Sequence, residues 1–290
     1  MPDNTINDAS LGNDGYIWFA THSGIACINM TNSWKTYDTG NSELPSNSVL
    51  DIEHENNYAW CATHGGVASF YNDQWTTYDT GNSDIPSNLI ACVDIDNNGN
   101  KWFGTLNSGL VSFDDFSWVV YDTATSALPS NEVVSVNVDK SGIVWCVTRK
   151  GVAEIDGALW NIYTSGNSGL FSDYVYCMAV DSSGDKWFGC QNGVSRFDGS
   201  VWTTYDSGNS PVLRDSVLCI AVDRFGNVWI GTTHGLTVFT GGEWTDYTGD
   251  RYKLLDNKSV SSISFDTSYL NKWIGTSSSG VIAFGPTILK

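Results

Sequence analysis

Three of the four histidines lie in one turn of a short phrase that recurs along the chain. His22 occurs in Thr-His-Ser-Gly, His64 in Thr-His-Gly-Gly and His234 in Thr-Thr-His-Gly. An imidazole titrates near neutral pH and can act as a general base or bind a metal ion. Because the phrases are far apart in sequence, a shared site requires the fold to bring different copies of a repeated unit together.

Other polar and aromatic side chains gather in the same parts of the repeat. Arg149 and Gln191 take, in later copies, the place that His22 and His64 take in earlier ones. The linkers between copies end in Pro-Ser-Asn three times and then change in sequence. The change introduces Phe171, Tyr174, Arg214, Arg251 and Tyr252. Guanidinium groups and phenol rings suit sugar hydroxyls, carboxylates or the polar rim of a protein partner; the alternative is ordinary solvated loop charge.

One segment resembles the opening of a calcium-binding loop. It reads Asp94-x-Asp96-x-Asn98-Gly99, but Thr105 stands where such a loop carries its bidentate glutamate. Sister segments begin at Asp139, Asp181 and Asp223 and read DKSG, DSSG and DRFG. Short turns of this type form because Asp and Asn side chains bond to nearby backbone amides. We therefore interpret these segments as hairpin turns and expect neither a metal ion nor a cofactor.

Tryptophan spacing reveals the unit that must position these side chains. Seven tryptophans open near-copies of one phrase at intervals of about 42 residues, the size of a single supersecondary unit. They are Trp18, Trp60, Trp102, Trp145, Trp187, Trp229 and Trp273. The other six each begin a Trp-x-x-Tyr segment. All thirteen tryptophans are thus part of the repeat.

Each unit reads as four short strands joined by tight turns. In residues 215–250 we expect strands at 216–223, 228–232, 236–239 and 244–247. A four-stranded antiparallel sheet buries little alone, whereas seven in a ring cover one another and protect their edges. The sequence predicts an all-β, seven-bladed β-propeller of four-stranded antiparallel blades over residues 1–290, as a single domain. Because only six Trp-x-x-Tyr segments exist, the seventh blade should lack a full outer strand.

The repeat also predicts several local features. The tryptophans should wedge between adjacent blades, and the glycine after each second strand should adopt positive φ. An Asn or Asp before each first strand should cap a turn. Since neighbouring strands are antiparallel, the second-to-third and fourth-to-first connections should share one face. That face carries His22, His64 and His234 on separate blades, which disfavours a common metal site.

The frame D-x-x-G-N-x-W-I-G-T-x-x-G-L-x-x-F-x-G-x-x-W-x-x-Y, complete in residues 223–247, resembles the two-component regulator propeller repeat of bacteria. The resemblance extends over residues 4–284. It implies the fold and a periplasmic or secreted setting, because such propellers form sensing parts of hybrid histidine kinases, often recognise polysaccharide fragments, and also occur in secreted proteins. The second propeller, β-sandwich, membrane span and kinase of those sensors are absent from this sequence.

Composition excludes some partners. The formal net charge is −18, which disfavours nucleic acid and anionic membranes. The sequence contains no long apolar run and no leader, so we expect no membrane insertion. The seven cysteines form no Cys-x-x-Cys pair, and we expect them to be buried free thiols.

We predict a non-catalytic binding propeller for a glycan fragment or a protein partner. The ligand should lie on the face of the second-to-third and fourth-to-first connections, off-centre towards blades 4–7. Its expected contacts are His22, His64, Arg149, Phe171, Tyr174, Gln191, Arg214, His234, Arg251 and Tyr252. The alternatives are a lyase resembling the streptogramin lyases, whose repeats resemble Trp-Phe-Thr-Glu with a Glu that no copy here carries, or a purely structural scaffold.

Overall fold

The computed structural model describes residues 1–13, 15–29, 31–210, 216–247, 258–265 and 271–285, all of whose regular elements are strands. The first strands of the seven blades are β1 (Ile6–Leu11), β5 (Val49–Glu55), β9 (Ile90–Ile95), β13 (Val133–Val138), β17 (Val175–Val180), β21 (Val217–Val222) and β25 (Val260–Phe265). The second strands are β2 (Tyr16–Thr21), β6 (Tyr58–Thr63), β10 (Lys101–Thr105), β14 (Val144–Thr148), β18 (Lys186–Cys190), β22 (Val228–Thr232) and β26 (Lys272–Thr276).

The remaining strands complete the blades. The third strands are β3 (Gly24–Asn29), β7 (Gly66–Tyr71), β11 (Leu110–Phe113), β15 (Gly151–Asp156), β19 (Gly193–Phe197), β23 (Gly235–Thr240) and β27 (Val281–Phe284). The fourth strands are β4 (Trp34–Tyr37), β8 (Gln74–Tyr78), β12 (Trp118–Tyr121), β16 (Leu159–Tyr163), β20 (Trp202–Tyr205) and β24 (Glu243–Asp246). In blade 6 the predicted strands are confirmed to within one residue at each end.

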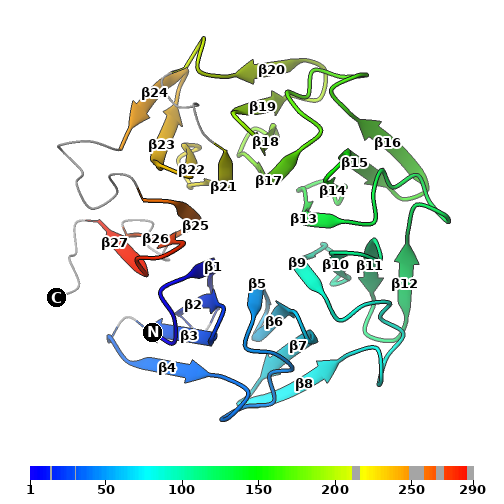
Figure 1. Ribbon diagram of the computed structural model, residues 1–290, viewed down its shortest axis with the longest axis vertical. Helices are drawn as coiled ribbons and strands as arrows, with labels where there is room; N and C mark the ends of the chain where they lie inside the picture. The colour runs from blue at the N-terminus through cyan, green and yellow to red at the C-terminus, as the bar shows by residue number, and fades with distance from the viewer. Residues whose placement is uncertain (14, 30, 211–215, 248–257, 266–270, 286–290) are drawn as a thin grey trace.

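Each blade is an antiparallel meander, and the seven blades form a ring with the first strands innermost (Figure 1). Six sheets have four strands, and the last, β25-β26-β27, has three in the described part of the chain. The predicted propeller and its incomplete seventh blade are therefore confirmed. The ring closes where the carbonyl of Asn4 accepts a hydrogen bond from the Gly280 amide at 2.8 Å. The Thr5 hydroxyl also donates to the carbonyl of Ser277.

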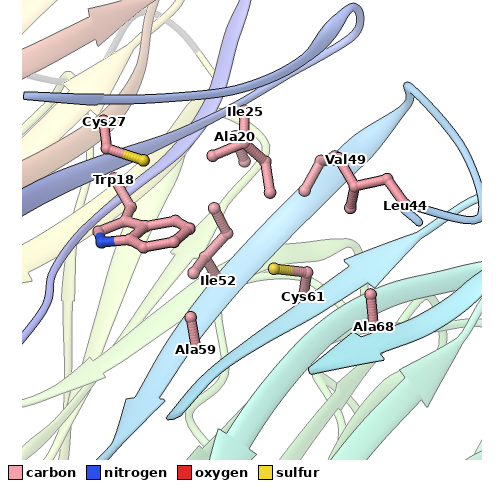
Figure 2. Close-up of a cluster of buried hydrophobic side chains, with 10 residues drawn as sticks. All are labelled: Trp18, Ala20, Ile25, Cys27, Leu44, Val49, Ile52, Ala59, Cys61 and Ala68. Carbon is pink, nitrogen blue, oxygen red and sulfur yellow. The ribbon is translucent and has the colours of Figure 1, made fainter. Parts of the chain in front are cut away.

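The hydrophobic core consists of layers between adjacent blades. Trp18 of blade 1 packs against Ile52, Ala59 and Cys61 of blade 2 (Figure 2). Equivalent layers place Trp60, Trp145, Trp187, Trp229 and Trp273 among residues of the following blade, with the layer after blade 7 formed by blade 1. The prediction that this tryptophan wedges between blades is confirmed. Because every layer needs two blades, no single blade can bury its own apolar surface.

The glycine after the second strand has positive φ in six blades, as expected, but not in the fifth. There Asn192 takes the left-handed conformation, with a φ of 66°. A Cβ on Gly193 would lie only 2.9 Å from the ring of Phe171, so the missing side chain makes room for that ring. The expectation of positive φ at Gly193 was therefore wrong.

The Asn or Asp before each first strand caps a turn in four blades. The side chains of Asn47, Asn88, Asn131 and Asp173 each accept a backbone N–H from eight residues earlier. The backbone carbonyls of three of them also accept the amide of the glycine that begins or directly precedes the third strand of the preceding blade. The pairs are Asn47 with Gly24, Asn131 with Gly109 and Asp173 with Gly151. The predicted turn cap is confirmed there. At Asn4 of blade 1 the carbonyl accepts the Gly280 amide, but the side chain makes no such cap among the described residues. Asp215 and Asn257 lie outside the described residues.

Three cysteines fill space that a glycine leaves across the same blade. Cys92, Cys177 and Cys219 pair with Gly104, Gly189 and Gly231, whose added Cβ atoms would lie 2.4–2.5 Å from the sulfurs. All seven cysteines are free thiols, and burial raises the pKa of those in the core. They therefore act as small apolar side chains.

We expect a thiol titration under denaturing, non-reducing conditions to find close to seven free thiols. In the native protein the same reagent should react slowly, because thiolate is the reactive form and burial disfavours it. Cys177 and Cys219, which are only half-buried, should react first. A single titratable thiol after denaturation would show three disulfides and contradict the structure.

Candidate functional site

The channel mouth is surrounded by seven residues that each follow a second strand. They are His22, His64, Leu106, Arg149, Gln191, Thr233 and Ser277, here called the mouth ring. In six blades the mouth-ring amide donates to the carbonyl of the residue just before the first strand, at 3.0–3.4 Å. These backbone hydrogen bonds hold the connection in place whatever the side chain is, so the mouth-ring side chains can vary from blade to blade.

The two histidines of blades 1 and 2 meet at one serine. The hydroxyl of Ser48 lies 3.4 Å from Nδ1 of His22 and 3.2 Å from Nδ1 of His64. A hydroxyl has one proton, so it donates to one ring and accepts from the other. The structure therefore brings together two histidines that the sequence placed on separate blades, through a serine that the sequence analysis did not single out.

A second cluster lies on blades 4 and 5. Nε of Arg149 is 3.4 Å from a carboxylate oxygen of Glu132, and its guanidinium stacks over the ring of Tyr176 at 4.7 Å. The backbone N–H of Gln191 donates to the backbone carbonyl of Tyr174. Tyr174 itself is 56% exposed. Predicted residues Arg149, Tyr174 and Gln191 are thus neighbours in the fold. The sequence analysis missed Glu132 and Tyr176, which lie just before and within first strands.

The other predicted residues lie elsewhere. The Phe171 ring is half-buried and packs on the core between blades 4 and 5. His234 is exposed one residue beyond the mouth ring, with Nδ1 3.2 Å from the Thr233 hydroxyl. The remaining three, Arg214, Arg251 and Tyr252, lie outside the described residues.

Below the mouth, the channel wall of blades 1–3 carries four carboxyl groups. Asp8, Asp51, Glu53 and Asp94 line a cavity of about 240 Å³, together with Ser135 and Asn137 of blade 4. Burial in the channel raises the pKa of all four carboxyls, and repulsion from neighbouring carboxylates adds to the rise for Asp8, Glu53 and Asp94. For Glu53 the pKa rises to about 8 and for Asp94 to about 7.

The sequence analysis missed this cluster, although aligned first strands contain the signal. Asp51 and Glu53 of blade 2 correspond to Ser135 and Asn137 of blade 4. The corresponding residues of blades 5 and 6 are Cys177, Ala179, Cys219 and Ala221. Neutral side chains therefore close the same ring in other blades, so the propeller fold as such does not require acids at these positions.

The segment that resembles a calcium loop does not form one in the structure, because the carboxylates of Asp94 and Asp96 face different surroundings. Asp96 accepts the indole N–H of Trp102 at 3.2 Å, whereas Asp94 faces the channel. The equivalent carboxylates of Asp139, Asp181 and Asp223 accept Trp145, Trp187 and Trp229 in the same way. Among the described residues no group of three His, Cys, Asp or Glu side chains could hold a metal ion.

Comparison with known families supports the repeat assignment. The family described as two component regulator propeller matches residues 212–234, which confirms the resemblance of the repeat. A comparison with curated proteins gives no significant match. Within the described residues, no helical segment could span a lipid bilayer.

Several solved structures share the fold. The extracellular domain of the hybrid two component system BT3049 from B. thetaiotaomicron is 19% identical, with a TM-score of 0.80 over 96% of this chain and 39% of that one. PorZ of Porphyromonas gingivalis, a surface component of the type-IX secretion system, is 18% identical, with a TM-score of 0.78 over 98% and 46%.

Virginiamycin B lyase from Staphylococcus aureus is 13% identical, with a TM-score of 0.77 over 96% of this chain and 94% of that one. At such identities these likenesses establish the propeller fold. The chain spans about two fifths of the length of the sensor domains. The protein is thus a seven-bladed propeller carrying a two-component regulator type of repeat.

Proposed function

We propose that the protein is a non-catalytic, extracytoplasmic binding propeller whose ligand docks at the mouth ring. One observation carries the proposal: backbone hydrogen bonds hold the ring, yet four of its seven side chains are two imidazoles, a guanidinium and a carboxamide. Polar side chains that folding does not require are expected to serve binding. The extracellular domains and the surface component among the similar structures support an extracytoplasmic setting.

The ligand class follows from the chemistry of the blade 4–5 cluster. The cluster combines three kinds of group. The planar guanidinium of Arg149 can donate two parallel hydrogen bonds, Tyr174 presents an exposed phenol ring, and the side-chain amide of Gln191 can both donate and accept. Such a set fits sugar hydroxyls and carboxylates, so a glycan fragment is the favoured ligand. A polar protein segment, the second candidate, would use the same groups.

The test compares two triple variants on opposite faces. Against a ligand found on a glycan array, Arg149→Ala/Tyr174→Ala/Gln191→Ala should weaken binding at least about tenfold, since anchor residues commonly contribute more than 1 kcal/mol. The melting temperature should fall only slightly, because Tyr174 and Gln191 are exposed and Arg149 loses only one surface ion pair and one cation–π contact, each worth about 1 kcal/mol or less. Phe116→Ala/Leu159→Ala/Phe225→Ala is the control, because all three side chains are exposed in or next to turns of the opposite face. If only the control variant loses binding, the ligand binds the face opposite the mouth ring and the proposed site is wrong.

A lyase activity remains the alternative, favoured by the lyase structures that this chain matches over nearly their full length. The imidazoles of His22 and His64 would then supply the general base. Turnover of a streptogramin B substrate that disappears in His22→Ala/His64→Ala would support the lyase and refute the non-catalytic proposal.

A further inference from the structure

Three of the four channel carboxyls bridge neighbouring blades through backbone amides. Asp8 accepts the Ile52 amide of blade 2 at 3.3 Å, and Asp51 accepts the Val93 amide of blade 3 at 2.8 Å. The contact repeats one blade further on, where Asp94 accepts the Val138 amide of blade 4 at 2.6 Å. First strands expose an unpaired edge to the channel, and these carboxyls satisfy part of it.

The carboxyls of the cluster repel one another. Burial raises the pKa of Asp8 most, and the charges of Asp51 and Glu53 raise it further. Glu53 lies in the same cavity, repelled by the charges of Asp51 and Asp94.

Among the described residues that line the cavity, the ionisable groups are the four carboxyls, and the charge of Asp96 also raises the pKa of Asp94. The charges of Asp8 and Asp51 in turn raise the pKa of the neighbouring Cys61 thiol. His54, also on β5, turns its ring towards Trp18 at 5.6 Å, on the side of the blade 1–2 core. Facing strand β13 contributes the neutral Ser135 and Asn137. Each carboxyl in this cavity becomes neutral when it takes up a proton.

We propose that the carboxyl cluster of Asp8, Asp51, Glu53 and Asp94 is a pH-responsive element that holds blades 1–4 together in acid and loosens them as the medium turns alkaline. When the cluster ionises, like charges face one another in the cavity that the first strands of blades 1–4 share. Blades 5–7, whose corresponding positions are neutral, should not respond.

The direction of the effect follows from linkage. The folded-state pKa values of the cluster are raised, to about 8 for Glu53 and about 7 for Asp94. Unfolded carboxyls titrate near pH 4. Between these limits the folded protein binds more protons than the unfolded chain, so stability is fully present below about pH 4 and is lost as pH rises towards about 8.

Thermal and urea unfolding across this range test the proposal. For the unaltered protein the unfolding equilibrium constant should increase at least about tenfold between about pH 5.5 and about pH 8.5. Glu53→Gln and Asp94→Asn, which copy the neutral chemistry of Asn137, should each flatten this dependence. Asp84→Asn, at an exposed loop position, makes the same charge change and should leave it intact. A flat or rising stability, or equal slopes in all variants, would overturn the proposal.

A second measurement does not depend on the variants folding. In a carbon-detected NMR titration of the unaltered protein, side-chain carboxyl carbons should titrate above about pH 6. If every carboxyl carbon titrates below about pH 5, the cluster is ionised throughout and the proposal is wrong.

Discussion

Replacing Trp145 by alanine is expected to lower the free energy of unfolding by about 3–5 kcal/mol. Trp145 is completely buried between blades 4 and 5, where its ring lies 5.9 Å from Phe188. Its indole N–H donates to Asp139, and Lys186 sits over the ring at 5.2 Å. The substitution leaves a cavity, removes one of the donors to the buried Asp139 carboxylate, and leaves Lys186 without its aromatic partner.

Urea denaturation followed by circular dichroism measures this effect, with Trp34→Ala as the matched control. Trp34 begins an outer strand and is 44% exposed, so its loss should cost no more than about 1 kcal/mol. Equal losses in the two variants would mean that the tryptophans of the second strands do not hold the blades together.

Replacing Gly66 by alanine should destabilise the protein by about 2–5 kcal/mol, the sum of backbone strain and overpacking. Gly66 has a φ of 125°, and an added Cβ would lie 2.3 Å from the carbonyl oxygen of Tyr78. That oxygen belongs to the backbone at the end of β8, so it cannot rotate away. Blade 2 would have to shift its outer strand to accept the methyl group.

Gly142→Ala separates strain from crowding. Gly142 also has positive φ, at 84°, but an added Cβ there would meet nothing within 4 Å. Its cost should stay near 1 kcal/mol, the lower end for a residue in this backbone region. Thermal unfolding of both variants gives the comparison. If Gly142→Ala costs as much as Gly66→Ala, the close approach to Tyr78 contributes nothing.

Much of the fold was predictable because it depends on local chemistry repeated seven times. Gly226 and Gly235 mark the two inner hairpin turns of blade 6. The alternation of aromatic and polar residues from Trp244 onwards predicts the outer strand of that blade. The prediction of positive φ was wrong where the turn sequence departs from the repeat. In blade 5, Asn192 adopts the positive φ instead of Gly193. Phe171, predicted as a ligand contact, fills the space above Gly193.

The candidate site was predictable only in part. Sequence alignment of the repeats identified the positions of His22, His64, Arg149 and Gln191, because each follows the same strand. It did not identify Ser48, Glu132 or Tyr176, which belong to a different connection or strand and come next to them only across a blade.

The sequence by itself determined the number of blades, their strand order and which connections share a face, because periodicity and antiparallel pairing leave no other arrangement. Only the tertiary structure decided which side chains meet across blades. Asp8, Asp51 and Asp94 are about one repeat apart in sequence, yet ring closure places them in one cavity. Their raised pKa values arise there, since burial and repulsion depend on distances between blades that no single repeat encodes.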